Sequence, residues 1–219
     1  MRIFSSFFAI GLSFVLVGVA QAATITWGAA TNSASSSDIA DGGEVIASLN
    51  GGQPSLPDLV LNDVTFTGND ITGGGTAGGM MTSHSTGDTT YDSFLTTLSV
   101  GGGSGERTRT VHGLTIGSDY LIQIWFTDLR NATSNRTMRF GDGNGNTVDL
   151  KARNGAYGQY AIGTFTADAT SQDYTMDPLG FSNGHITGLM VREAAPIPEP
   201  STAILLGIGL LGLAKRARP

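Results

Sequence analysis

The sequence has no cysteine, only three histidines and few charged residues, and each shortage excludes a kind of chemistry. Without cysteine there are no disulfide bonds and no thiolate nucleophiles. The histidines, His84, His112 and His185, form no His-Glu-x-x-His pair, and no Gly-x-Ser-x-Gly elbow is present. A glycosidase-like pair of carboxylates is defined by its spacing in the fold, so that kind of site stays open. We expect a protein that is not an enzyme.

Basic residues are scarce in the long middle part of the chain. Residues 23–195 contain eight Lys and Arg against seventeen Asp and Glu, and the whole chain has a formal net charge of −6. Nucleic acids and anionic lipid surfaces are bound by clustered basic residues, so neither is expected as a partner of this part. An acidic surface is consistent with solubility outside the cell.

Long apolar runs occur only near the two ends of the sequence. At the N-terminal end, Arg2 precedes an apolar stretch over residues 3–20, and Ala20 and Ala22 supply the small residues of an A-x-A cleavage site. We therefore predict a secretory signal peptide over residues 1–22, with a signal helix that is removed by signal peptidase after Ala22. A retained N-terminal membrane helix is the alternative.

The C-terminal tail, residues 196–219, has three parts in a fixed order. They are the motif Pro198, Glu199 and Pro200, an apolar run over residues 203–214, and the basic residues Lys215, Arg216 and Arg218. As a helix, the twelve residues of the run would cover about 18 Å of a roughly 30 Å hydrocarbon core, so the run is a marginal membrane anchor. The basic end would stop it on the cytoplasmic side. The alternatives are a buried C-terminal helix and a permanent tail anchor.

This combination of motif, apolar run and basic end resembles the PEP-CTERM sorting signal of Gram-negative bacteria. The resemblance implies export and transient retention in the inner membrane through a C-terminal membrane helix. It also implies processing at the motif by an exosortase, a membrane-embedded enzyme similar to cysteine transpeptidases. The mature protein would then lie at the cell surface or outside the cell.

Between the two terminal segments, residues 23–195 have the pattern of one β-rich domain. The chain has 32 glycines, and frequent Thr, Ser, Asn and Asp residues fit short strands joined by tight turns. One helix is predicted over residues 88–98, where Asp88 can cap the first turn. The predicted strands cover residues 24–27, 44–49, 59–67, 108–112, 120–128, 137–140, 147–151, 160–167, 172–176 and 185–192.

Nine or ten strands without a βαβ alternation predict an all-β fold, an antiparallel β-sandwich of the jelly-roll kind. Residues 111–120, Val-His-Gly-Leu-Thr-Ile-Gly-Ser-Asp-Tyr, lead into a long central strand. This pattern resembles the galactose-binding-like sandwiches of secreted bacterial proteins. The resemblance implies the fold, and it implies that a structural calcium can accompany it.

One loop has oxygen-bearing side chains at alternate positions. Asp142, Asn144 and Asn146 have the spacing that calcium loops use. The rest of the EF-hand pattern fails, because Thr147 stands at the glycine position and Arg153 at the position of the bidentate glutamate. The alternative is a tight hairpin in which Gly and Asn supply a positive φ.

A second candidate site lies on the long strand over residues 120–128, whose side chains alternate between two faces. One face is uniformly apolar, and we expect it to be core. The other face is mixed, and there Trp125 could stack on a sugar ring while Gln123 and Arg139 supply hydrogen bonds. The alternative is that Trp125 packs under a loop or under the predicted helix.

Taken together, the sequence predicts an exported β-sandwich in the surface or extracellular polysaccharide layer. Its role would be structural or glycan-binding, an expectation that follows from the association of exosortase systems with exopolysaccharide production. A secreted polysaccharide hydrolase or lyase is the alternative. A deep cleft with facing carboxylates would favour the enzyme.

Overall fold

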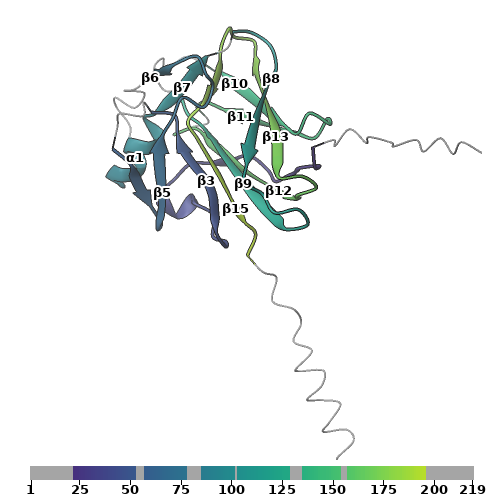
Figure 1. Ribbon diagram of the computed structural model, residues 1–219. Helices are drawn as coiled ribbons and strands as arrows, with labels where there is room; N and C mark the ends of the chain where they lie inside the picture. The colour runs from purple at the N-terminus through teal and green to yellow at the C-terminus, as the bar shows by residue number, and fades with distance from the viewer. Residues whose placement is uncertain are drawn as a thin grey trace, which may run out of the picture.

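The computed structural model describes residues 22–52, 57–77, 85–101, 103–128, 135–153 and 157–195. In these ranges the fold is mostly β, with fifteen strands, one α-helix and one 3₁₀ helix. The strands form two large sheets and a small third sheet at one end (Figure 1). No helix among the described residues is long and apolar enough to cross a bilayer. The predicted signal and C-terminal membrane helices lie outside the described residues.

The larger sheet has eight strands. Their order is β1, β12, β9, β15, β3, β5 and β4, with β2 paired to β12. β15, the last strand in the chain, lies in the middle of this sheet between β9 and β3. The strands are β1 (Thr26–Trp27), β2 (Thr31–Asn32), β3 (Val45–Asn50), β4 (Leu59–Leu61), β5 (Val64–Gly68), β9 (Asp119–Phe126), β12 (Gln159–Thr166) and β15 (Gly188–Glu193).

The second sheet has four antiparallel strands in the order β11, β10, β13 and β8. The small sheet has three, in the order β14, β7 and β6. These strands are β6 (Thr76–Ala77), β7 (Leu98–Gly101), β8 (Arg107–His112), β10 (Thr137–Gly141), β11 (Thr147–Lys151), β13 (Ser171–Leu179) and β14 (Gly184–Ile186).

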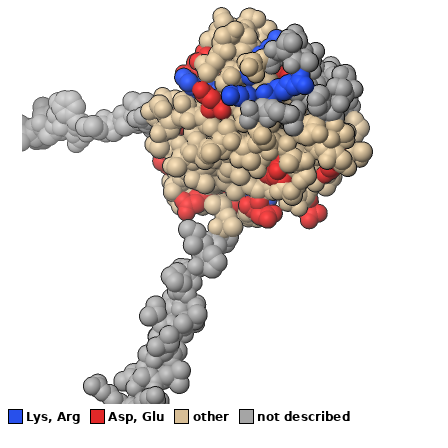
Figure 2. Space-filling model, turned by 180° about the vertical axis from the view of Figure 1, so that it is seen from behind, with Lys and Arg blue, Asp and Glu red and all other residues tan. Residues whose placement is uncertain are grey.

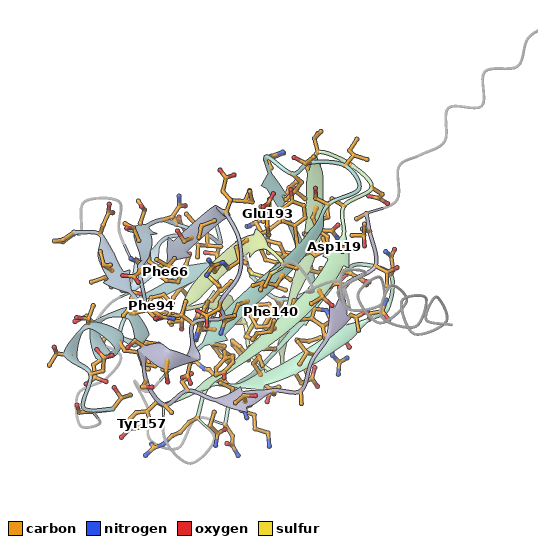
Figure 3. All side chains as sticks on the ribbon, turned by 90° about the horizontal axis from the view of Figure 1, so that it is seen from below. Phe66, Phe94, Asp119, Phe140, Tyr157 and Glu193 are labelled. Atoms are coloured by element: carbon orange, nitrogen blue, oxygen red, sulfur yellow. The ribbon has the colours of Figure 1, made fainter. Side chains whose placement is uncertain are left out.

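The side chains on the two faces of β9 belong to two different regions of the core. The four residues Tyr120, Ile122, Ile124 and Phe126 pack in one cluster with inward residues of the four-stranded sheet, including Phe140 (Figure 3). The uniformly apolar face of β9 is therefore core, as predicted from its sequence. This shared cluster makes the two large sheets the layers of a sandwich.

The opposite face of β9 is also covered. Leu121 and Trp125 belong to a second cluster, which includes Phe66 from β5 and Phe94 from helix α1 (Thr89–Leu95). Figure 3 shows Phe66 and Phe94 side by side, and their ring centroids are 4.9 Å apart. The larger sheet is therefore buried on both faces where β9 crosses it.

Helix α1 begins as predicted and ends earlier. The Asp88 carboxylate caps it by accepting from the amides of Thr90 (3.1 Å) and Tyr91 (3.0 Å). The predicted last residue, Leu98, instead opens β7, which pairs with β6 and β14. Leu98 is fully buried in this strand. Its apolar side chain fits the helical spacing, but the backbone forms sheet hydrogen bonds instead.

Two of the predicted strands are each divided into two. The segment 59–67 turns at Asn62 and Asp63, both with positive φ (46° and 62°), which gives the hairpin β4–β5. The segment 185–192 breaks at Thr187, whose hydroxyl accepts from the amide of Thr127 (2.8 Å). The wholly antiparallel prediction is also wrong at one place, because β3 runs parallel to β5.

Candidate functional site

The predicted glycan platform at Trp125 is buried. Trp125 and Gln123 both have no exposed surface, because α1 and the 3₁₀ helix η1 (Ser36–Asp38) cover this face of β9. Trp125 packs edge-on against Phe94 and Phe66, with centroids 5.2 and 5.8 Å away. The prediction that this face offers a sugar platform is therefore wrong, and the alternative, a tryptophan packed under the helix, is the one observed.

Gln123 holds the covering segment in place. Its Nε2 donates to the carbonyl oxygen of Asp38 (2.6 Å), and its Oε1 accepts from the amide of Ala40 (2.9 Å). Nearby, Trp125 Nε1 donates to the Tyr91 hydroxyl (3.2 Å), which donates to Asp38 (2.9 Å). Burial and the negative charge of Asp38 raise the pKa of Tyr91, so its hydroxyl stays a donor. The polar groups on this face are structural.

Arg139, the third member of the predicted platform, lies on β10 in the other sheet. It points away from the core as predicted, and its guanidinium donates to both oxygens of Asp149 (2.7 and 3.0 Å). Both side chains are 42% exposed, so this ion pair contributes little to stability. The structure therefore does not bring Arg139 together with Trp125 and Gln123.

The predicted calcium loop is held by hydrogen bonds to Asp142, which is 2% exposed. Its carboxylate accepts from the amides of Asn144 (2.7 Å), Asn146 (3.2 Å) and Ile25 (3.1 Å) and from Nδ2 of Asn146 (2.7 Å). Burial alone would raise the pKa of Asp142, but these hydrogen bonds outweigh it and hold the pKa below its usual range.

This geometry favours the alternative reading of the loop, a hairpin. A cation at Asp142 would have to displace N–H donors that already occupy its oxygens. Asn144 donates to the carbonyl oxygen of Ala22 (3.0 Å), so the loop also fastens the start of the domain. In the described ranges, no group of three or more His, Cys, Asp or Glu side chains could hold a metal ion.

A cleft opens between the two sheets where β3 and β8 form its sides. This β3–β8 cleft has a volume of about 290 Å³. Its floor is apolar, and its polar groups come from the loop after β5 and from β8 and β13. The residues that line it are Ala47, Leu49, Asn69, Asp70, Ile71, Arg109, Thr110, Val111, His112, Tyr174 and Leu189.

Two residues of this cleft stand directly opposite each other. Arg109 on β8 pairs with Tyr174 on β13, so both side chains leave the same face of the sheet. Tyr174 is 2% exposed. Burial raises the pKa of its phenol, although the charge of Arg109 opposes the shift, so the hydroxyl stays protonated.

Sequence reasoning missed this pair, although a signal for it exists. Arg107 and Arg109 share the phase of Val111, which is 6% exposed, so the alternation places both arginines on the inward face of β8. A charged residue at an inward position requires partners or a ligand. Nothing in the local sequence indicates that β13 supplies Tyr174, because that pairing is long-range.

A larger groove of about 770 Å³ lies at the end of the domain where β15 finishes. Its lining includes Asp119 and Glu193, and also Thr24 and Thr26 near the start of the domain and Ala194 and Ala195 at its end. Beyond β15, the amide of Ala194 donates to the carbonyl oxygen of Asp119 (2.9 Å). Acidic side chains lie along this end in Figure 2, so it is not a surface that attracts anionic lipid.

The chain leaves the described domain directly after this last hydrogen bond. Residues 196–218 match the PEP-CTERM protein-sorting motif. The tail is a sorting signal. This confirms the interpretation of the tail as a PEP-CTERM sorting signal, and it implies export, transient anchoring in the membrane and an exosortase as the processing partner. No curated protein and no solved structure matches the chain.

The sorting signal covers only the end of the chain, and the described domain is not assigned by any match. The galactose-binding-like and jelly-roll assignments stay predictions. The sorting residues, the basic residues Lys215, Arg216 and Arg218, and Ala20 lie outside the described residues. Ala22 is described, and its carbonyl oxygen accepts from Asn144.

Proposed function

We propose that this protein is a non-enzymatic component of the extracellular polysaccharide layer, delivered there by the exosortase route. The observation that carries the proposal is the sorting motif placed directly after a strand-rich domain. The domain itself would bind glycan or build the layer, and its acidic surface would keep it soluble after release. Signal peptidase would act first, after Ala22, and the exosortase second.

The placement of the strands is consistent with both processing steps. All described strands lie between Thr26 and Glu193, so neither cut would remove a strand. The last backbone hydrogen bond of the domain, from Ala194, precedes the sorting motif. Removal of the tail would therefore leave the sandwich intact, as a protein released at the surface requires.

The alternative, a polysaccharide hydrolase or lyase, has less support. The larger groove contains two carboxylates, Asp119 and Glu193. Glu193 is opposite Tyr120 in the β9–β15 pair, so its side chain leaves the sheet on the other face from that of Asp119. Asp119 is bound by the hydroxyl of Thr166 (2.6 Å). An acid and a base for glycoside cleavage must face the same bond, so side chains that leave opposite faces of the sheet give this alternative less support.

Replacing Glu199 by alanine is expected to block processing. The motif is short, and its central carboxylate is its only charged group, so the variant should remain in the membrane with its tail attached. Membrane fractionation and intact-mass measurement in an exosortase-positive host report the result. Glu106→Ala, the same change at an exposed position of the domain, should be processed like the parent. Normal release of the Glu199 variant would contradict the exosortase assignment.

Residues 23–195 are expected to unfold in one cooperative transition, with the same midpoint as residues 23–219 in detergent. The reason is that the strands and both core clusters lie inside the shorter segment. Circular dichroism during urea unfolding measures this. Two separate transitions would argue against a single domain. The same protein, applied to a glycan array with and without calcium, tests the binding role.

A further inference from the structure

We infer that the β3–β8 cleft is the glycan site of this domain and holds one sugar ring, with Tyr174, Arg109 and Asp70 as its hydrogen-bonding groups. This inference rests on the proposed function for the class of ligand. The position of the site follows from the geometry of the cleft alone.

The first observation is the Tyr174 hydroxyl. Its side chain is buried, it lines the cleft, and its hydroxyl forms no hydrogen bond with any residue in the described part of the chain. The hydroxyl oxygen is not one of the fully buried atoms that lack a partner, so it keeps accessible surface and is open to a hydrogen-bonding group in the cleft. A ligand group in the cleft would supply the missing partner.

The second observation is the state of the Arg109 guanidinium. Its Nε donates to the carbonyl oxygen of Ile71 (3.0 Å), its Nη1 to that of Thr108 (2.9 Å) and its Nη2 to that of Thr72. A guanidinium has five N–H groups, so two have no partner among the residues that the structure describes. The bonds also fix the orientation of the group, so little side-chain entropy is lost when a ligand binds.

Asp70 supplies an acceptor beside these donors. Its Oδ1 accepts from Ser99 (2.8 Å), from the amide of Gly73 (3.0 Å) and from Thr72 (3.2 Å). Among the described residues, Oδ2 accepts only from the amide of Gly75 (2.8 Å). Burial would raise the pKa of Asp70, but these hydrogen bonds outweigh it and keep the pKa low. The carboxylate therefore stays ionised, and Oδ2 retains capacity for a ligand hydroxyl.

These groups fit the chemistry of a sugar better than that of a simple ion or an apolar ligand. Sugar hydroxyls both donate and accept hydrogen bonds. This matches a site with two donor residues, Arg109 and Tyr174, and one acceptor residue, Asp70. The floor of the cleft includes Val111 and Leu189, which are 6% and 2% exposed and can contact the C–H groups of a ring. A volume of about 290 Å³ lies at the lower end of small-molecule sites, so one ring fits and a long oligosaccharide does not.

The test replaces Tyr174 by phenylalanine. This change removes one oxygen atom that has no hydrogen-bond partner in the described part of the domain, so the unfolding midpoint should stay the same or rise. Binding should fall by about three- to tenfold, the value of one hydrogen bond. The probes are the methyl glycosides of glucose, galactose, mannose and glucuronic acid, titrated into residues 23–195 and followed by NMR chemical shifts. The glycan that binds most strongly on the array is titrated in the same way.

The matched control is Tyr120→Phe. Tyr120 is equally buried, but its hydroxyl accepts from the amide of Thr115 (2.8 Å) and lies outside the cleft. This variant should lose stability and keep its binding. A second cleft variant, Asn69→Ala, changes an exposed residue at the rim and should weaken binding without affecting the fold.

The possible results distinguish a wrong site from a wrong function. If the parent binds a glycan and both cleft variants bind it equally well, the cleft is not the site, although the domain still binds glycan. If the parent binds none of the probes and no glycan on the array, glycan binding itself is wrong and the inference falls with it. Reduced binding in Tyr174→Phe, with the midpoint unchanged and Tyr120→Phe unaffected in binding, supports the assignment.

Discussion

Trp125→Ala is expected to destabilise the domain by about 3–5 kcal/mol, the usual cost of removing a large aromatic side chain from a core. Trp125 has no exposed surface and contacts rings from β5 and α1, which lie far apart in the sequence. Its loss would leave a cavity between the larger sheet and α1. It would also leave the Tyr91 hydroxyl without the donor that it accepts from.

Urea unfolding followed by circular dichroism measures this effect without relying on tryptophan fluorescence. Trp125→Phe, which keeps a ring in the cavity, should lose much less stability than the alanine variant. Val60→Ala, at a side chain that is 60% exposed, should change the midpoint little. A stable Trp125→Ala variant would mean that α1 does not cover this face in solution.

Asp142→Ala is expected to cost about 1–3 kcal/mol, because it leaves the buried amide of Ile25 without an acceptor and removes the part-buried hydrogen bonds of the loop. The variant removes the acceptor for Ile25 near the start of the domain and for the two Asn residues of the β10–β11 hairpin. We expect this part of the sandwich to open first, which hydrogen exchange at Ile25 would detect. Unchanged exchange at that amide would contradict the proposed role of the carboxylate.

The same carboxylate should make the domain sensitive to acid. Its pKa is lower in the folded state than in the unfolded state, so its contribution to stability is complete above the unfolded value of about 3.9 and is lost as the pH falls through the folded value. Unfolding free energies at pH 7 and pH 3 should therefore differ less in Asp142→Asn than in the parent. An identical pH dependence in the two proteins would contradict this assignment.

Local patterns were sufficient to predict much of the fold. Alternation over residues 120–126 indicated a buried face, and Asp88 indicated the start of a helix; both are observed. The division at Asn62 and Asp63 was missed because these residues lie inside an apolar run and tolerate a positive φ without glycine. The strands β2 and β6 have two residues each, too few for any periodic signal.

The candidate sites were harder to predict, because they depend on which elements cover which faces. Trp125 lies on a face of β9 that is half polar in sequence, and this face is buried because α1 and η1 cover it in the fold. The spacing of Asp142, Asn144 and Asn146 suits a cation and a hairpin equally well, and the donors that occupy the carboxylate decide between them. The pairing of Arg109 with Tyr174 joins segments more than sixty residues apart.

The central position of β15 has a mechanical consequence for a protein tethered by its C-terminus. A force on the tail is transmitted to the domain at Glu193 and acts along β15. This strand is hydrogen-bonded to β9 on one side and to β3 on the other. Because these bonds lie across the direction of the pull, they are strained together in shear and cannot be opened one at a time, as they would be at an edge strand. The tether is therefore attached at the part of the sheet that best resists drag on an anchored molecule.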